Sequence, residues 1–325
     1  VQNFFCYFFG ERMNISVFGI GYVGCVSLGC LAVDGHNVIG VDTNPGKVEL
    51  INSGKSTVTE KDLNELVFKG VSEKKIVATE DYIYAVKNSD ISVICVGTPL
   101  AKDGSLDLYH IIKVAEQIAE GLKLKKDFHI ISIRSSVPPG TVSKIEKIVA
   151  GISNKVVDKD FSVLANPEFL REGSAIHDYY NPPYTLIGGN NKSAMDTLAS
   201  IYNNVKSEIV FTNIVNAELI KFVNNSFHAL KVSFANEIGN ICSSLNIDSF
   251  KFMELFVKDT KLNISSSYLK PGFAYGGSCL PKDLSALENL AEKLKIETPV
   301  LSGISKSNEA HIEKAFHLIK ETKKK

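Results

Sequence analysis

The sequence predicts an α/β protein in which a doubly wound parallel sheet is followed by a helical domain. Two observations support this prediction. From Asn14 onward, apolar runs of strand length alternate with longer amphipathic stretches, a pattern typical of parallel strands connected by helices on both faces of a sheet. From Ala217 to Leu245 this alternation gives way to one long helical pattern without proline. A helix of that length, apolar over much of its circumference, usually bridges domains or packs against a partner.

The individual elements follow from these runs in chain order. Strands are expected at Ile15–Phe18, Asn37–Val41, Ile91–Cys95, Ile130–Ile133, Ser162–Leu164 and Tyr184–Ile187. Helices between them are expected at Tyr22–Asp34, Lys61–Lys69 and Leu108–Leu122. After the long helix, helical patterns continue to about Glu297, and a final one covers Ser302–Lys320.

The composition is that of an ordinary soluble protein. Of 325 residues, 44% are hydrophobic and 22% are charged, and 36 basic residues balance 36 acidic ones. Zero net charge gives no attraction to nucleic acid or to a membrane surface, so neither partner is expected. No apolar segment is long enough to span a bilayer. The basic runs at residues 123–126 and 323–325 are expected to be solvated surface.

The cysteine pattern indicates the cellular compartment and whether a metal site is expected. Six cysteines without a CxxC pair predict neither a disulfide framework nor a zinc site, so no metal is expected. Cys25, Cys30, Cys95 and Cys242 lie in apolar stretches and are expected to be small core residues. Unpaired thiols of this kind fit a reducing cytoplasm best.

A glycine-rich loop indicates a dinucleotide site. Gly19, Gly21 and Gly24 form a GxGxxG pattern between the first predicted strand and its helix. In a Rossmann-like domain such glycines make a tight turn and admit a pyrophosphate to the helix N-terminus, although a turn that binds nothing is the alternative. Asp42 ends the next strand, where it can accept hydrogen bonds from a ribose diol. No arginine follows Asp42 to meet a 2′-phosphate, so NAD is predicted rather than NADP.

Residues 276–283, Gly-Gly-Ser-Cys-Leu-Pro-Lys-Asp, contain the candidate nucleophile. Two glycines before Cys279 let another molecule approach the backbone, and the ammonium group of Lys282 favours the reactive thiolate. The alternative is a small buried hydrophobic residue. A nucleophilic cysteine in a chain with a nicotinamide cofactor indicates an oxidation that passes through a sulfur-bound intermediate.

The segment 166–172 carries candidate carboxylates. Asn166 and Pro167 predict a helix start, and Glu168 and Glu172 would then share one face of that helix. One interpretation is that acidic side chains near a helix N-terminus are simply stabilised by the dipole. The other is that the carboxylates handle water or protons at a reaction centre.

The long helix carries a polar stripe in apolar surroundings. Lys221, Asn225 and His228 fall at positions i, i+4 and i+7, and Asn236 lies near the same face. A surface seam would explain the stripe. The functional alternative is a row of donors directed at sugar oxygens or at a developing oxyanion.

Six segments together resemble a known family, the UDP-glucose/GDP-mannose dehydrogenases, and the similarity runs from Met13 to about Ala310. They are GIGYVG at 19–24, VGTP at 96–99, RSSVPPGT at 134–141, NPEFLREGSA at 166–175, the helix around Lys221, and GGSCLPKD at 276–283. The chain is most similar to the GDP-mannose branch, with the UDP-glucose branch next. The segments that favour the GDP-mannose branch are 182–183, 228–232, 234–237, 261–263 and Leu280.

The resemblance implies a two-step oxidation of a sugar primary alcohol to a carboxylate with two molecules of NAD. Cys279 would capture the intermediate aldehyde as a thiohemiacetal, the second oxidation would give a thioester, and water would release the acid. Lys221 would stabilise the oxyanion, and Asp283 and Glu172 would assist water and proton transfers. The other implied contacts are Glu172, Lys221, Asn225, His228, Asn236 and Tyr268 for the nucleotide sugar, and Gly19, Gly21, Tyr22, Val23, Gly24, Asp42, Lys47, Thr98, Ser136 and Lys282 for NAD.

The resemblance also implies a division into domains. Residues 13–212 would be the Rossmann-like NAD-binding domain and 213–300 a helical central domain that carries Cys279 and forms a homodimer or higher homo-oligomer through the long helix. Residues 301–325 would begin a C-terminal domain that covers the nucleotide in the family and is otherwise missing here. Residues 1–12 would be an extension of unknown role. A non-catalytic, dimerising fragment that binds NAD is the alternative of another class.

Three substitutions depart from the family pattern. Ser267 and Lys270 stand in the loop 265–270 where similar enzymes of the GDP-mannose branch carry an aromatic residue and an arginine. Lysine offers no bidentate fork, so the affinity or specificity for the sugar nucleotide is expected to differ. Ser136 replaces a threonine but keeps the hydroxyl group.

Overall fold

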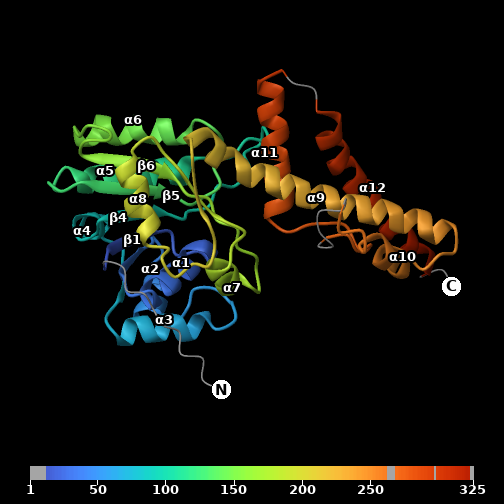
Figure 1. Ribbon diagram of the computed structural model, residues 1–325, viewed down its shortest axis with the longest axis horizontal. Coiled ribbons are helices and arrows are strands. Elements are labelled where there is room, and N and C mark those ends of the chain that lie inside the picture. The colour runs from blue at the N-terminus through green and yellow to red at the C-terminus, as the bar shows by residue number, and fades with distance from the viewer. Residues whose placement is uncertain (1–11, 262–267, 296–297, 323–325) are drawn as a thin grey trace. The chain divides into compact units, whose positions relative to one another are not determined.

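The computed structural model describes residues 12–261, 268–295 and 298–322 (Figure 1). These residues form two compact units. Unit 1 comprises the described residues up to Pro99 together with Asp107–Leu219, and unit 2 comprises Leu100–Leu106 and the described residues from Ile220 on. Within these ranges, none of the helices combines the length and the hydropathy needed to cross a bilayer.

Unit 1 is built on a single sheet in the order β3-β2-β1-β4-β5-β6-β7-β8. The strands are β1 (Asn14–Phe18), β2 (Asn37–Val41), β3 (Ile76–Thr79), β4 (Ile91–Ile94), β5 (His129–Ile133), β6 (Phe161–Ala165), β7 (Thr185–Gly188) and β8 (Ile209–Thr212). Neighbouring strands are parallel except for β6 and β7. The doubly wound parallel sheet and the six expected strands are confirmed, whereas β3 and β8 were not predicted.

Helices cover both faces of this sheet. They are α1 (Tyr22–Val33), α2 (Pro45–Asn52), α3 (Leu63–Ser72), α4 (Tyr82–Lys87), α5 (Tyr109–Leu122), α6 (Thr141–Ser153), α7 (Ala175–Tyr180) and α8 (Lys192–Ser200). Side-chain caps begin several of them: Asn44 accepts from Gly46 N at 2.9 Å to begin α2, and Asn191 accepts from Ala194 N at 3.1 Å to begin α8. Figure 1 shows α5 and α6 on one face of the sheet, with α1, α2 and α3 on the other.

The apolar core lies mainly between the sheet and the layer of α1, α3, α7 and α8. Ile15 and Val17 of β1, Leu28 of α1 and Leu198 of α8 all belong to it. Every residue of α1 from Gly24 to Ala32 is buried, because this helix runs beneath the middle of the sheet. The rigid core therefore positions the loops at the carboxyl ends of the strands.

A ring of buried polar groups lies among the early strands. His129 Nε2 lies 2.8 Å from Ser92 Oγ, which in turn contacts Ser16 Oγ at 2.8 Å. Lys125 donates to the carbonyl of Ser89 and lies 3.2 Å from His129 Nδ1. Burial and the nearby ammonium group lower the pKa of His129 to about 3, so the imidazole stays neutral. The expectation that residues 123–126 form a solvated basic run is therefore wrong for Lys125, which is buried.

Unit 2 is helical, as predicted. Its elements are α9 (Ile214–Ser244), which begins in unit 1, α10 (Ser249–Phe256), α11 (Cys279–Lys293) and α12 (Pro299–Thr322). Ala229 of α9, Leu284 of α11 and Ile304 of α12 form one small core, and Ala235, Met253 and Leu269 form another. The predicted long helix and the predicted final helix are confirmed within a few residues at each end.

Candidate active site

The glycine loop lies at the carboxyl end of β1, next to the point where the strand order reverses between β1 and β4. Gly19 has φ +89°, and a Cβ there would lie 2.8 Å from Val96 Cγ1. A Cβ on Gly24 would lie 1.9 Å from the carbonyl oxygen of Gly19. By contrast, a Cβ on Gly21 would meet nothing within 4 Å. The first and third glycines are thus required by packing, and the second faces open space that a ligand can occupy.

Asp42, at the end of β2, lies against this loop. Its Oδ2 accepts a hydrogen bond from Ile20 N at 2.8 Å and pairs with Lys47 Nζ at 3.1 Å, and its Oδ1 accepts from Asn44 N at 3.0 Å. The structure therefore brings together Asp42, Lys47 and the glycine loop, all expected at the dinucleotide site. Val23 and Tyr22 are half-buried at the start of α1.

Thr98 and Ser136 follow β4 and β5 and are also brought together. Thr98 is buried, and its Oγ1 donates to the carbonyl of Ser136 at 2.9 Å. Since the carboxyl ends of parallel strands meet at one edge of a sheet, these loops share that edge with the glycine loop. This is where ligands bind in open α/β sheets.

Residues 166–174, here called the acidic loop, connect β6 to α7. No helix begins at Asn166: α7 begins at Ala175, so the predicted helix start is wrong, and Glu168 and Glu172 do not share a helical face. The side chain of Asn166 is used elsewhere. Its Oδ1 accepts from Tyr202 Oη at 2.5 Å and from Arg134, and its Nδ2 donates to the carbonyl of Leu186 at 2.8 Å.

The side chain of Arg134 holds the start of the acidic loop in place. The guanidinium is buried, donates to Asn166 Oδ1 at 3.2 Å and to Tyr202 Oη at 2.9 Å, and lies 5.8 Å from the ring centroids of Tyr179 and Tyr202. Such a cage keeps a desolvated cation in place through hydrogen bonds and cation–π contacts. Glu168, two residues after Asn166, accepts a hydrogen bond from Leu170 N at 2.5 Å.

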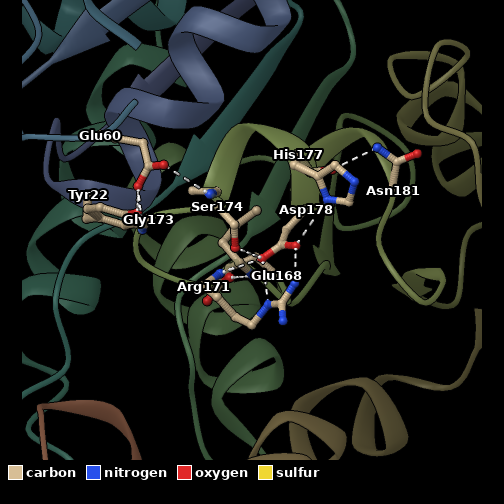
Figure 2. Close-up of polar contacts among 11 residues, drawn as sticks. Tyr22, Glu60, Glu168, Arg171, Gly173, Ser174, His177, Asp178 and Asn181 are labelled. Carbon is tan, nitrogen blue, oxygen red and sulfur yellow. Dashed lines mark hydrogen bonds and ion pairs between the residues drawn. The ribbon is translucent and has the colours of Figure 1, made fainter. Parts of the chain in front are cut away.

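The second half of the acidic loop folds around Asp178 of α7. Arg171 donates to both carboxylate oxygens, at 2.9 and 2.7 Å, and Ser174 Oγ donates at 3.0 Å (Figure 2). Burial disfavours the charged form of Asp178, but these hydrogen bonds outweigh it, so the pKa lies below its ordinary value. Glu172 is exposed next to this turn.

Glu60 closes the same turn from another segment and was not predicted. It accepts hydrogen bonds from the Tyr22 hydroxyl, from Gly173 N at 2.8 Å and from Ala175 N at 3.3 Å (Figure 2). Burial and the Glu60 carboxylate raise the pKa of the Tyr22 phenol, which stays protonated as a donor. Glu60 is more than a hundred residues from its amide partners, and no local pattern marks it.

In unit 2, a buried carboxylate lies between α9 and α11. Asp283 accepts a hydrogen bond from the Asn225 amide, and its Oδ1 lies 3.5 Å from Lys282 Nζ. Burial raises the pKa of Asp283, and the charges of Lys282 and Lys221 together with the Asn225 hydrogen bond offset this only in part. Four predicted site residues, Lys221, Asn225, Lys282 and Asp283, thus lie in one cluster.

Cys279 is the first residue of α11 and is exposed, unlike the four cysteines expected in the core, which are buried as predicted. Gly277, with φ +77°, makes the turn into the helix, and Ser278 Oγ lies 3.7 Å from Cys279 Sγ. Asn308 of α12 braces this segment, because its side chain bonds both the N–H and the carbonyl of Tyr275, at 2.9 and 3.0 Å. The sulfur therefore stands at a helix N-terminus on a supported turn.

The remaining predicted contacts lie along α9. His228 stacks on Tyr268 with ring centroids 5.1 Å apart. Asn236 bonds the backbone of the loop after Tyr268: its Oδ1 accepts from Gly272 N at 2.8 Å and its Nδ2 donates to the carbonyl of Phe273 at 3.1 Å. Lys270 is exposed. Ser267 and residues 262–263, which also entered the sequence argument, lie outside the described residues.

Comparison with protein families agrees with this geometry. Residues 13–206 match the NAD-binding domain of the UDP-glucose/GDP-mannose dehydrogenase family, and residues 215–310 match the central domain of the same family. The chain belongs to the UDP-glucose/GDP-mannose dehydrogenase family. It is therefore an NAD-dependent nucleotide-sugar dehydrogenase by family, and the expected cofactor is confirmed at this level.

Individual relatives cover both branches of the family. The GDP-mannose 6-dehydrogenase of Pseudomonas savastanoi pv. phaseolicola is 45% identical over 308 residues, which are 94% of this chain and 70% of the relative. A ternary complex of GDP-mannose dehydrogenase from Pseudomonas aeruginosa is 45% identical with a TM-score of 0.77, covering 95% of this chain and 71% of that one. A UDP-glucose dehydrogenase from Pyrobaculum islandicum is 35% identical with a TM-score of 0.92, covering 96% and 71%.

Proposed function

We propose that this protein oxidises the primary alcohol of GDP-mannose to the carboxylate of GDP-mannuronate, as a GDP-mannose 6-dehydrogenase does. The observation that carries the proposal is an exposed cysteine at the start of α11 in a chain that also holds an NAD-binding domain and is 45% identical to enzymes of that name. Three other groups near the α11 start, on Lys221, Asn225 and Asp283, supply the charges and hydrogen bonds that such chemistry uses.

The chemistry follows from the thiol. Bound NAD⁺ accepts the hydride in each of the two oxidations. After the first, the Cys279 thiolate adds to the aldehyde carbon, a C–S bond forms, and the oxygen takes a proton to give a thiohemiacetal. Loss of a second hydride and of the hydroxyl proton converts this to a thioester. Water then breaks the C–S bond and releases the acid, which regenerates the thiol.

The cluster around Asp283 suits the proton transfers. Because burial raises the pKa of this carboxyl, it can accept and return a proton more readily than an exposed aspartate. Asn225 fixes its orientation through one carboxylate oxygen. Lys221 supplies a buried ammonium group for the oxyanion that develops on the sugar carbon. In unit 1, Glu168 and Glu172 of the acidic loop are the candidates that handle the hydrolytic water.

UDP-glucose is the alternative substrate. Sequence identity favours the GDP-mannose enzymes, whereas the backbone is most like the UDP-glucose dehydrogenase among the two structures compared. Backbone superposition does not register the side chains that select a base or a sugar, so we weigh identity more heavily. Lys270 stands where the resemblance implies an arginine in the GDP-mannose branch, so the affinity or specificity for the sugar nucleotide is expected to differ.

The test is stoichiometric. Mixed with NAD⁺ and GDP-mannose, the protein should form two NADH per sugar, measured by absorbance near 340 nm, with UDP-glucose run in parallel. Cys279→Ser should abolish the second oxidation, since an alcohol oxygen is a far weaker nucleophile at neutral pH. Cys242→Ala, which removes a buried thiol of α9, is the matched control and should keep both steps. NAD binding without turnover of any nucleotide sugar would refute the proposal and favour a non-catalytic NAD-binding fragment.

We infer that a second copy of the chain packs against the apolar face of α9. Val223, Phe227 and Phe234 are each exposed by about two fifths, at 42%, 38% and 40%. At about 100° per residue they fall within roughly 40° of one another around the helix. The buried residues Lys221 and Asn225 lie on the opposite side. A helix whose polar face is buried and whose apolar face is exposed needs a partner for that apolar face.

A further inference from the structure

We propose that Glu60 is a positioning residue that ties Tyr22 of the glycine loop to the backbone of the acidic loop, so that dinucleotide binding and the placement of Glu172 are coupled. The proposal rests on the proposed function, because it concerns the loop that would supply the hydrolytic carboxylates. Glu60 itself lies in the segment between α2 and α3 and belongs to neither loop.

The contacts are made by one carboxylate with three donors. Oε2 accepts from the Tyr22 hydroxyl and from Gly173 N at 2.8 Å, and Oε1 accepts from Ala175 N at 3.3 Å. Gly173 N also approaches Tyr22 Oη at 3.3 Å, so the three groups form a closed set (Figure 2). Hydrogen bonds to an ionised acceptor are the stronger kind, and both oxygens are used.

The position of this link makes it more than a loop brace. Tyr22 is the first residue of α1 and follows Gly21, the glycine that faces open space where a pyrophosphate would approach. Gly173 follows Glu172 directly and has φ +85°. A hydrogen bond to Gly173 N therefore holds the backbone next to the Glu172 carboxylate. A shift of Tyr22 on dinucleotide binding would therefore reach Glu172 through a single side chain.

Two other sets of contacts support the acidic loop. Arg134 and Tyr202 hold Asn166 at its start, and Asp178 holds Arg171 from within α7. The hydrogen bonds of Glu60, together with the contact of Gly173 N, join the acidic loop to Tyr22. Loss of Glu60 should leave the loop attached to the fold and joined to Tyr22 only by the longer contact of Gly173 N with Tyr22 Oη, at 3.3 Å.

Glu60→Gln is the sharpest variant. An amide whose oxygen takes the Oε2 position still accepts from Tyr22 and Gly173 but loses the charge that strengthens both bonds, and its N–H groups face Ala175 N, so that bond is lost and the link is weakened. Tyr22→Phe removes a single oxygen and tests the other end. Asp62→Asn is the matched control: this carboxylate lies two residues away, is exposed, and has φ +63°, a conformation that asparagine tolerates.

Hydrogen exchange tests the link without turnover. In Glu60→Gln the amide of Ala175 should exchange about 10-fold faster or more than in the wild type and that of Gly173 should also exchange faster, though by less, and Asp62→Asn should leave both unchanged. Saturating NAD⁺ should slow these amides in the wild type and not in Glu60→Gln or Tyr22→Phe. Equal exchange and an equal response to NAD⁺ in the wild type and Glu60→Gln would overturn the proposal, whether or not any nucleotide sugar is oxidised.

Kinetics with the proposed substrate supply the second readout. Glu60→Gln and Tyr22→Phe should each lower kcat on the order of 10- to 100-fold, because small misplacement of a reacting group is costly. The double variant should be no slower than the slower single variant, since both break one link. Additive losses that track the unfolding temperature would mean a structural role alone and would refute the coupling. If Glu60→Gln does not fold, the Tyr22→Phe comparison decides.

Discussion

Gly21 and Gly24 lie three residues apart in one loop, yet the space available for a side chain differs between them. A methyl group on Gly24 would sit 1.9 Å from the backbone oxygen of Gly19, and neither atom can move without undoing the turn. A methyl group on Gly21 would extend into open space, and φ −82° there is ordinary for any residue. A shared motif thus contains one glycine required by the fold and one left free for a ligand.

This difference predicts opposite outcomes for two alanine substitutions. Gly24→Ala should cost about 3 kcal/mol or more of unfolding free energy, because the added atom overlaps backbone. Gly21→Ala should change stability by less than about 0.5 kcal/mol and should weaken NAD binding on the order of 10-fold or more, because the methyl group occupies the path of the pyrophosphate. Urea unfolding and titration calorimetry measure the two effects. Unimpaired NAD binding by Gly21→Ala would contradict a dinucleotide site at this loop.

Asp34 is a residue whose protonation should be visible in the stability of unit 1. It ends α1, its Oδ1 accepts from Asn204 Nδ2 at 3.0 Å and from Tyr180 Oη at 3.3 Å, and burial raises its pKa to about 6. The folded state therefore holds this proton more tightly than the unfolded state. Its contribution to stability is present below the unfolded pKa near 4 and is lost as pH rises through about 6.

Asp34→Asn should remove that pH dependence. The amide keeps one acceptor for Asn204 and Tyr180 and carries no charge at any pH. Relative to the wild type, the variant should gain on the order of 1 kcal/mol of unfolding free energy between about pH 5 and about pH 7.5. Urea unfolding at the two pH values measures this. A constant difference between the two proteins would mean that Asp34 titrates in the folded state as it does in the unfolded chain.

At the scale of elements, the sequence predicted the helices and strands that have a clear hydrophobic period. It did not predict features that depend on contacts with residues distant in the chain. The six expected strands and the long helix have clear periods, and all appear. The strands β3 and β8 are the edge strands of the sheet and are only partly buried, whereas β4 and β7, which are equally short, are buried throughout. Asn166 looked like a helix cap because Pro167 follows it, but Arg134 and Tyr202 take its side-chain oxygen, and the helix begins later.

The same distinction applies to the candidate site. Motif residues such as Asp42, Thr98 and Ser136 could be placed because the ends of parallel strands meet at one edge. Glu60 could not, because its role depends on a turn between β6 and α7 that no local pattern encodes. Lys125 was misassigned for a related reason. Its charged neighbours predict exposure, whereas its amine is buried against Ser89 and His129.

At the scale of the whole molecule, the two units divide the chemistry. Unit 1 holds the glycine loop and the acidic loop, and unit 2 holds Cys279 and the Asp283 cluster. The polar face of α9 is occupied within unit 2 by that cluster, and its apolar face is exposed. Assembly through α9 would therefore steady the helix that presents Lys221 and Asn225, and disruption of the assembly should affect both mass and activity.

Phe234→Glu tests that assembly. Phe234 is exposed in the chain itself, so a carboxylate there should be tolerated by a folded monomer, but burying it in an interface between two copies leaves an unpaired charge. The wild type should sediment at twice the chain mass, and the variant should dissociate about 30-fold or more readily. Leu124→Glu, which charges an exposed leucine of unit 1, is the matched control and should leave the mass unchanged. A wild type that stays monomeric at every concentration, or a variant that associates as tightly as the wild type, would mean that this face of α9 meets no second copy.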